Sequence, residues 1–235
     1  MVYNETTLTM DSRGKFIVIE GTDGSGKTVQ FERLVLALPE NVKLGTLDFP
    51  RYSEPSSYFV QHYLTGKYGS DVGPRAASIF FAVDRFDAKL KIAQWFDEER
   101  VIVANRYVGS NMAHQGAKME NKKDRAEFFK WLYDLEYGIF GIPKPDLNII
   151  LHVPAEISYE LIAKKAGREY LAGKTRDIHE ADFNYQKRSE QVYLEIAELF
   201  PESFTIVECA PDGKLLSIDA IHEMVWAAAR KTLGL

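Results

Sequence analysis

The chain has 235 residues, of which 46% are hydrophobic and 27% charged, with a formal net charge of −5 at pH 7. This length is enough for one α/β domain with a full core over residues 1–235. The acidic balance argues against a general nucleic-acid binder, which presents a basic face to phosphates. A single cysteine, Cys209, excludes an internal disulfide and a multi-cysteine zinc site.

The N-terminus is polar, without the apolar segment of a secretory signal, and no apolar run reaches membrane-spanning length. We therefore expect a cytoplasmic protein that has neither a membrane nor a nucleic acid as partner.

Apolar runs typical of strands alternate with helical patterns along the chain. Strands are expected near residues 16–20, 42–49, 100–104, 146–153 and 204–208, and helices at 56–65, 74–98, 122–137 and the C-terminus. Strands that alternate with helices form parallel sheets covered on both faces. The sequence thus predicts an α/β fold with a five-stranded parallel sheet and helices on both faces.

Two core assignments follow from these patterns. Residues 79, 83, 86 and 90 of the helix expected at 74–98 are apolar at spacings of three and four, which predicts a buried stripe. Cys209 is expected to be a small buried residue at the end of the last strand.

The strongest motif is the segment 16–30, FIVIEGTDGSGKTVQ. An apolar strand leads into a glycine-rich loop and then a helix, the context of a phosphate-binding loop, in which backbone N–H groups surround phosphates. Lys27 is expected to reach the β- and γ-phosphates and to be exposed without nucleotide, and Thr28 is expected to bind Mg²⁺. The ATP-binding residues predicted by this motif are Gly21, Thr22, Asp23, Gly24, Ser25, Gly26, Lys27 and Thr28.

Other phosphate-loop classes fit less well. A GTPase would carry an N-K-x-D motif after an apolar strand, whereas the NKKD at 121–124 follows the polar AKME and indicates an exposed helix start. A motor ATPase would end a strand with an acid, whereas the strand VIVA is followed by Asn105 and Arg106. Small-molecule phosphoryl transfer remains.

Several segments together resemble the thymidylate kinase family. They are EGTDGSGKT at 20–28, DFPRY at 48–52, FFAVDRFD at 80–87, NRYVGSNMAHQGA at 105–117 and RDIHEAD at 176–182. The resemblance implies the P-loop kinase fold, transfer of the γ-phosphoryl group of ATP to dTMP with Mg²⁺, and a homodimer.

The resemblance also implies site residues. Asp23 matches the loop aspartate near the acceptor sugar, and Arg106 matches the arginine that clamps the acceptor phosphate, for which a bidentate guanidinium is suited. Phe49 and Arg51 correspond to the F-P-x-R element, although the arginine comes one place early.

For the acceptor base, Phe81 matches the aromatic residue that stacks on thymine, and Arg85 matches the arginine that reaches the base or the monophosphate. Asn111 and Gln115 stand where the family reads the thymine amide edge, since an amide can pair with N3–H and O4.

Three positions depart from the family pattern. Asn105 replaces the usual aspartate of D-R-Y, Val29 replaces a hydroxyl residue after the loop, and His114 replaces an aromatic residue beside the ribose 2′ position. Asn105 and His114 nonetheless stay among the expected substrate-binding residues.

The basic segment 164–182 is expected to form a small mobile lid. Gly24 stands where some family members carry a loop arginine, so the transition-state cation must come from elsewhere. Arg168 is the first candidate, because it follows a glycine and resembles the family's lid arginine, and Arg176 is the second.

Three other functions stay open, one of which is another nucleoside monophosphate kinase of the same fold. A deoxynucleoside kinase shares the fold and lid, but the arginines at 51, 85 and 106 favour an acceptor that carries a phosphate. A non-enzymatic nucleotide-binding module would have no reason to keep a basic lid.

Overall fold

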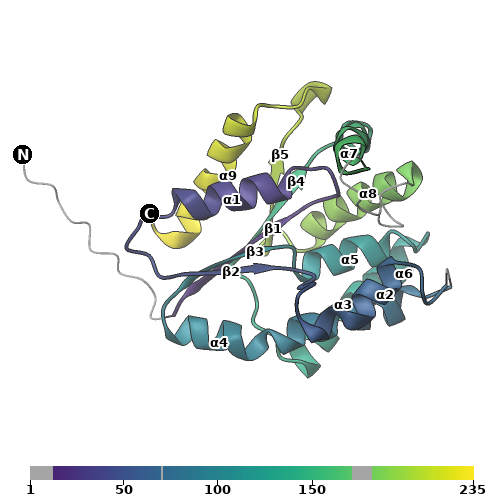
Figure 1. Ribbon diagram of the computed structural model, residues 1–235, viewed down its shortest axis with the longest axis horizontal. Coiled ribbons are helices and arrows are strands. Elements are labelled where there is room, and N and C mark those ends of the chain that lie inside the picture. The colour runs from purple at the N-terminus through teal and green to yellow at the C-terminus, as the bar shows by residue number, and fades with distance from the viewer. Residues whose placement is uncertain (1–12, 70, 171–181) are drawn as a thin grey trace, which may run out of the picture.

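The computed structural model describes residues 13–69, 71–170 and 182–235, with the side chains of all but 164–170. Five strands form one parallel sheet: β1 (Lys15–Glu20), β2 (Leu44–Asp48), β3 (Val101–Asn105), β4 (Leu147–His152) and β5 (Phe204–Glu208). Their order in the sheet is β2-β3-β1-β4-β5, and every pairing is parallel. The α/β fold expected from the sequence is confirmed (Figure 1).

Helices cover both faces of this sheet, as Figure 1 shows. On one face lie α1 (Lys27–Ala37) and α9 (Ile218–Leu233). Around the other are α2 (Tyr58–Leu64), α3 (Pro74–Asp87), α4 (Lys89–Asp97), α5 (Val108–Gly116), α6 (Lys122–Tyr133) and α8 (Phe183–Leu199). Helix α7 (Ala155–Tyr170) follows β4, and short helical turns occur at η1 (Pro55–Ser57), η2 (Asp134–Ile139) and η3 (Pro211–Gly213).

The two-residue period of β1 divides the core into two clusters. Ile17 and Ile19 pack with α1 and α9, whereas Phe16 and Val18 pack with the helices of the opposite face. All four side chains are fully buried, as expected for the central strand of a sheet covered on both sides. This arrangement holds the carboxyl end of β1, where the phosphate loop begins, between two packed layers.

The expected helix 74–98 is wrong in two respects. It is two helices, because α3 ends before Ala88 and α4 begins at Lys89. Its apolar stripe is not core: Ile79, Phe86 and Leu90 are 40%, 48% and 79% exposed. The face of α3 that turns inward carries small and charged residues because it lines a cavity, described below.

Smaller expectations hold. Cys209 is fully buried directly after β5, and Asn121 caps the exposed start of α6 by accepting a hydrogen bond from the Lys123 amide. Helix α6 ends at Tyr133 and the chain continues as the π-helix η2. In the described ranges, each helix is too short or too polar to cross a bilayer.

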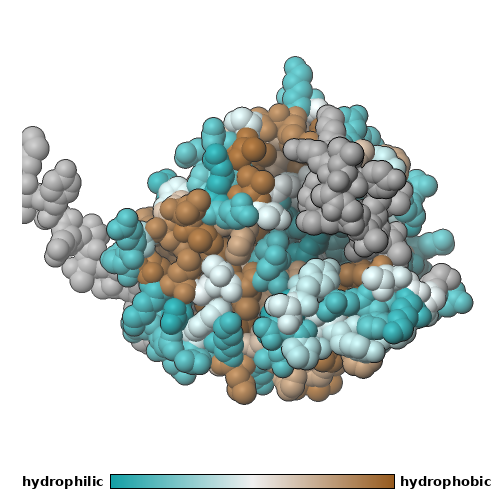
Figure 2. All heavy atoms as spheres, viewed as in Figure 1, coloured by the Kyte–Doolittle hydropathy of each residue, from teal (hydrophilic) through white to brown (hydrophobic). Residues whose placement is uncertain are grey.

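On the face shown in Figure 2, hydrophobic residues gather mainly over α1 and α9. The hollow above α2 and α3 is lined mostly by hydrophilic residues.

Candidate active site

The phosphate loop connects β1 to α1. Gly21, Gly24 and Gly26 have φ values of 143°, 81° and 85°, which are backbone conformations that residues other than glycine rarely adopt. A Cβ at Gly24 would lie 2.4 Å from the Ser158 carbonyl oxygen of α7. The loop therefore has no room for an arginine at this position.

Lys27 does not extend into solvent, so its expected exposure is wrong. The side chain is 7% exposed and its Nζ donates to the Thr22 carbonyl oxygen at 2.6 Å, with Asp23 Oδ1 at 3.8 Å. Burial, together with the nearby charge of Arg106, lowers the pKa of Lys27 to about 7. A bound anion would offset the cost of burying this ammonium group.

Two hydroxyl oxygens of the loop, Thr22 Oγ1 and Ser25 Oγ, are buried without a hydrogen-bond partner among the described residues. Buried polar groups are normally satisfied. Both hydroxyls belong to the segment that the motif assigns to phosphate, and a bound phosphate would offer the missing acceptors.

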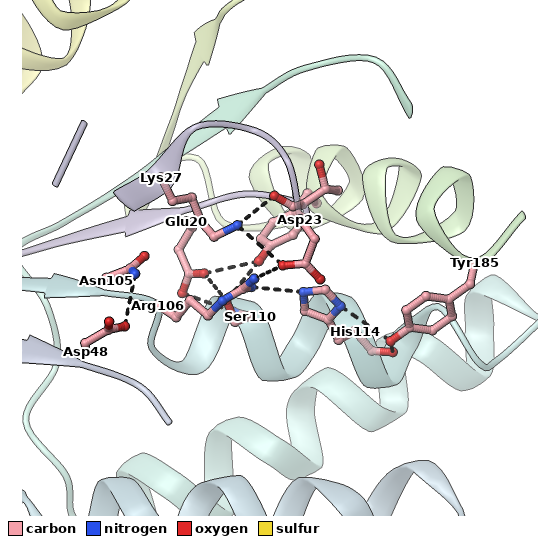
Figure 3. A network of polar contacts seen from close by, with 11 residues as sticks. Glu20, Asp23, Lys27, Asp48, Asn105, Arg106, Ser110, His114 and Tyr185 are labelled. Atoms are coloured by element: carbon pink, nitrogen blue, oxygen red, sulfur yellow. Dashed lines mark hydrogen bonds and ion pairs between the residues drawn. The ribbon is translucent and has the colours of Figure 1, made fainter. Parts of the chain in front are cut away.

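Arg106, at the carboxyl end of β3, joins the loop to α5 (Figure 3). Its Nη2 donates to Asp23 Oδ1, and its Nη1 donates to Ser110 Oγ at 3.2 Å and to His114 Nε2 at 3.1 Å. Because a guanidinium only donates, Nε2 of His114 is the accepting nitrogen. The Tyr185 hydroxyl donates to the His114 carbonyl oxygen at 2.9 Å, which ties α8 to the same network.

This network keeps Asp23 and Arg106 charged. Burial opposes both charged forms, but Arg106 and Lys27 hold the pKa of Asp23 well below its usual value, and Asp23 raises that of Arg106. Arg106 also has a φ of 65°, uncommon for a residue other than glycine, so its backbone is held in a strained conformation at the site.

Glu20, the last residue of β1, holds the start of α5 in place, and this residue was not among the expected site residues. Its fully buried carboxylate accepts from the backbone amides of Tyr107 and Ser110, at 2.9 and 3.0 Å, and from Ser110 Oγ at 2.5 Å. Since Tyr107 and Ser110 form the start of α5, the carboxylate caps that helix. A charged residue closing the otherwise apolar strand 16–20 was the available signal.

The loop, α3 and α5 enclose a cavity. Its lining consists of Asp23, Phe49, Pro50, Tyr52, Leu64, Phe81, Asp84, Arg85, Arg106, Tyr107, Ser110, Asn111, His114 and Gln115. The lining includes the charged pair of Asp23 and Arg106. The other residues include an aromatic side chain, Phe81, and two buried amides, Asn111 and Gln115, whose Oδ1 and Oε1 have no partner in the described part of the chain.

Comparison with known proteins decides the family. The thymidylate kinase family model matches residues 19–221. The chain belongs to the thymidylate kinase family. Curated relatives include the thymidylate kinase of Mycobacterium tuberculosis, 34% identical over 77% of this chain and 85% of that protein. A probable thymidylate kinase of Pyrobaculum aerophilum is 32% identical over 78% of this chain and 95% of its own.

Among solved structures, a thymidylate kinase of Candida albicans is similar over 94% of both chains, with a TM-score of 0.73 and 26% sequence identity. The similarity confirms the P-loop kinase fold.

The cavity gathers every substrate-binding residue expected from the thymidylate kinase resemblance except Arg51 and Asn105. Arg51 is committed to acidic partners instead: its Nε lies 3.1 Å from Asp84 Oδ1, and its Nη2 donates to Asp87 Oδ2 at 2.6 Å and Ser56 Oγ at 2.8 Å. The lining residues that were not among the expected site residues are Pro50, Tyr52, Leu64, Asp84, Tyr107 and Ser110.

Asn105, which departs from the family pattern, donates through Nδ2 to Asp48 Oδ1 at 3.0 Å, while its own Oδ1 is buried without a partner in the described ranges. Burial raises the pKa of Asp48. These oxygens and the exposed Thr28 at the start of α1 are of the donor type that Mg²⁺ prefers.

The side chains of two expected residues lie beyond what the structure describes. The backbone of Arg168 belongs to α7, but its side chain is outside the described atoms, and Arg176 is outside the described residues. The catalytic lid expected at 164–182 therefore stays a prediction.

Proposed function

We propose that this chain transfers the γ-phosphoryl group of ATP to dTMP and releases ADP and dTDP. The observation that carries the proposal is the cavity that begins beside the phosphate loop at Asp23 and Arg106 and also contains Phe81, Asn111 and Gln115. A nucleoside monophosphate has the matching polarity, with an anion at one end and a flat amide-bearing ring at the other.

In the reaction, a phosphate oxygen of dTMP attacks the γ-phosphorus and the bond to the β–γ bridging oxygen breaks. A phosphate monoester is a dianion at neutral pH, since its second pKa is about 6, so no general base is needed. Catalysis then rests on positioning and on neutralising charge. Lys27 would leave the Thr22 carbonyl for the donor phosphates, and Arg106 would hold the acceptor phosphate.

The base would lie against Phe81, with its amide edge on Asn111 and Gln115. Their buried carbonyl oxygens lack partners within the described structure and would accept hydrogen bonds, and the N3–H of thymine is a donor for one of them. A base that binds here satisfies groups that are otherwise costly to bury.

Mg²⁺ belongs to the proposal. When bound with ATP it would neutralise phosphate charge, and the Thr28 hydroxyl is the residue expected to hold it, with Asp48 and Asn105 as nearby oxygen donors.

An assay of ADP release with ATP and a panel of dTMP, dUMP, dCMP, dAMP, dGMP and thymidine tests the proposal. We expect the highest kcat/KM with dTMP. A higher value with thymidine would favour a deoxynucleoside kinase, the alternative with the same fold.

We include a homodimer and a cytoplasmic location in the proposal. The apolar side chains of Ile79, Phe86 and Leu90 are exposed along α3 and α4, and exposed apolar patches mark interaction surfaces. Light scattering should give twice the monomer mass, and Phe86→Lys with Leu90→Lys should shift it to the monomer. A wild-type monomer at micromolar concentration would contradict the dimer.

A further inference from the structure

Glu136 is a fully buried carboxylate that the phosphoryl transfer itself does not require. It lies in η2, a π-helical turn, and such turns often occur at functional sites. Its two oxygens contact two cavity residues from different helices: Arg85 of α3, with Nε at 2.5 Å and Nη2 at 2.6 Å, and Asn111 of α5, with Nδ2 at 3.1 Å. One side chain outside the cavity thus contacts two residues that line it.

The Asn111 amide can have only one orientation in this setting. Its Nδ2 lies 3.1 Å from Glu136 Oε1 and 3.1 Å from the Ser78 carbonyl oxygen. A carboxylate and a backbone carbonyl only accept, so both neighbours require the NH₂ group. The Oδ1 atom is therefore the one left over, and it is buried without a protein partner among the described residues.

The same carboxylate holds Arg85 charged and in place. Arg85 is 2% exposed, and burial disfavours its charge, but Glu136 outweighs this and raises the pKa of Arg85. The third contact of the guanidinium, from Nη1 to the Tyr107 carbonyl oxygen, is long at 3.4 Å. Because Nε and Nη2 both donate to Glu136, Nη1 is the guanidinium nitrogen that has only a weak protein partner and can donate to a ligand in the cavity.

We infer that Glu136 is a positioning residue that sets base specificity: by engaging the Asn111 NH₂ group, it makes Asn111 a hydrogen-bond acceptor for the substrate. The inference rests on the proposed function. A pyrimidine with N–H at position 3, such as thymine or uracil, donates to Oδ1. Cytosine presents a lone pair there, so two acceptors face each other and Oδ1 stays unsatisfied.

Glu136→Gln tests this role, because the replacement keeps the side-chain shape but adds a donor. The new NH₂ group can replace the acceptor oxygen beside Asn111 Nδ2, and the orientation of the Asn111 amide then depends on the Ser78 carbonyl oxygen alone. Dissociation constants of dTMP and dCMP measured by calorimetry give a ratio for each variant. The ratio is the dissociation constant of dCMP divided by that of dTMP. We expect it to exceed one in the wild type, where dTMP binds more tightly, and to fall at least tenfold in Glu136→Gln.

A matched control is available in a second ion pair outside the cavity lining. Glu195 Oε2 lies 3.1 Å from Arg125 Nε and 2.8 Å from Nη2, with side-chain exposures of 13% and 11%. Glu195→Gln removes a comparable charge pair without touching Asn111, and its dCMP-to-dTMP ratio should stay within twofold of the wild-type value.

Because Glu136→Gln leaves a buried cation uncompensated, Glu136→Asp serves as a second variant. It keeps the negative charge, but its shorter side chain cannot reach both Arg85 and Asn111, so the ratio should again fall. An unchanged ratio in the folded variants, with dTMP still preferred, would overturn the role of Glu136 and leave the proposed function intact. A wild-type protein that neither binds nor phosphorylates dTMP would overturn both.

Discussion

Asp23 in the phosphate loop and Arg106 at the end of β3 form an ion pair between residues 83 positions apart in the sequence. The pair places a cation, fixed on its other side by Ser110 and His114, between the expected donor and acceptor sites. The pair thus lies where the expected donor and acceptor sites meet, and the first prediction depends on this placement.

Arg106→Ala should reduce kcat/KM for dTMP by more than about tenfold, since a bidentate clamp on the acceptor phosphate is lost. ATP affinity should change little. Arg106→Lys keeps the charge at the same strained backbone position but lacks the planar fork, so it should restore only part of the activity. Steady-state kinetics and nucleotide titrations check this, and a parallel loss of ATP affinity would place Arg106 in the donor site.

Arg85→Ala should lower stability as well as activity, because it leaves the fully buried Glu136 without its cation. Breaking such a pair costs about 3–5 kcal/mol, measurable by urea unfolding. Removing both charges with Arg85→Leu and Glu136→Leu should recover much of the stability but not the activity. Unchanged stability in Arg85→Ala would show that the pair is not formed in solution.

ATP binding should take up protons above neutral pH. The pKa of Lys27 is about 7 before ATP binds and rises when phosphates become its partners. Near pH 8 the free ammonium is mostly deprotonated, so binding must reprotonate it and affinity should fall as pH rises. Near pH 6 it is already protonated and uptake by Lys27 should vanish.

Calorimetry in buffers of different ionisation enthalpy measures this uptake. Lys27→Arg is the matched control, because it keeps the positive charge and does not titrate in this range. Equal uptake in the wild type and Lys27→Arg at pH 8 would assign the proton to another group.

Arg168→Ala should lower kcat strongly with a modest change in either KM, since an arginine on the transferring phosphoryl group can be worth several powers of ten. Gly24→Arg should not restore the rate, because the loop backbone faces the Ser158 carbonyl oxygen, 2.4 Å from a Cβ at that position. Full activity in both Arg168→Ala and Arg176→Ala would exclude a catalytic lid.

The parts of the site that sequence predicted are those set by local pattern. The phosphate loop has a fixed spacing and needs glycine at positive φ, so segment 21–28 was recognisable from one stretch. The runs of the three central strands β1, β3 and β4 are almost entirely buried, and the parallel sheet followed from the alternation of such runs with helices.

Two of the failures came from contacts that span the fold, and one came from a local contact in the phosphate loop. The stripe on α3 has helical spacing, but spacing does not tell which face turns inward, and here the polar face with Arg85 does. Glu136 lies 51 residues from Arg85, and its role appears only when η2 packs beside α3 and α5. Lys27 was expected in solvent because the motif describes how this lysine contacts bound phosphates. It does not indicate that, without nucleotide, the side chain bends back to the Thr22 carbonyl oxygen.

Transfer of label from γ-³²P-ATP tests the central proposal most directly, with dTMP and thymidine as competing acceptors and Lys27→Ala as the blank. We predict that label appears in dTDP, that dTMP outcompetes thymidine, and that the Lys27→Ala protein transfers almost none while remaining folded. Label in dTMP formed from thymidine, or undiminished transfer by Lys27→Ala, would contradict the account.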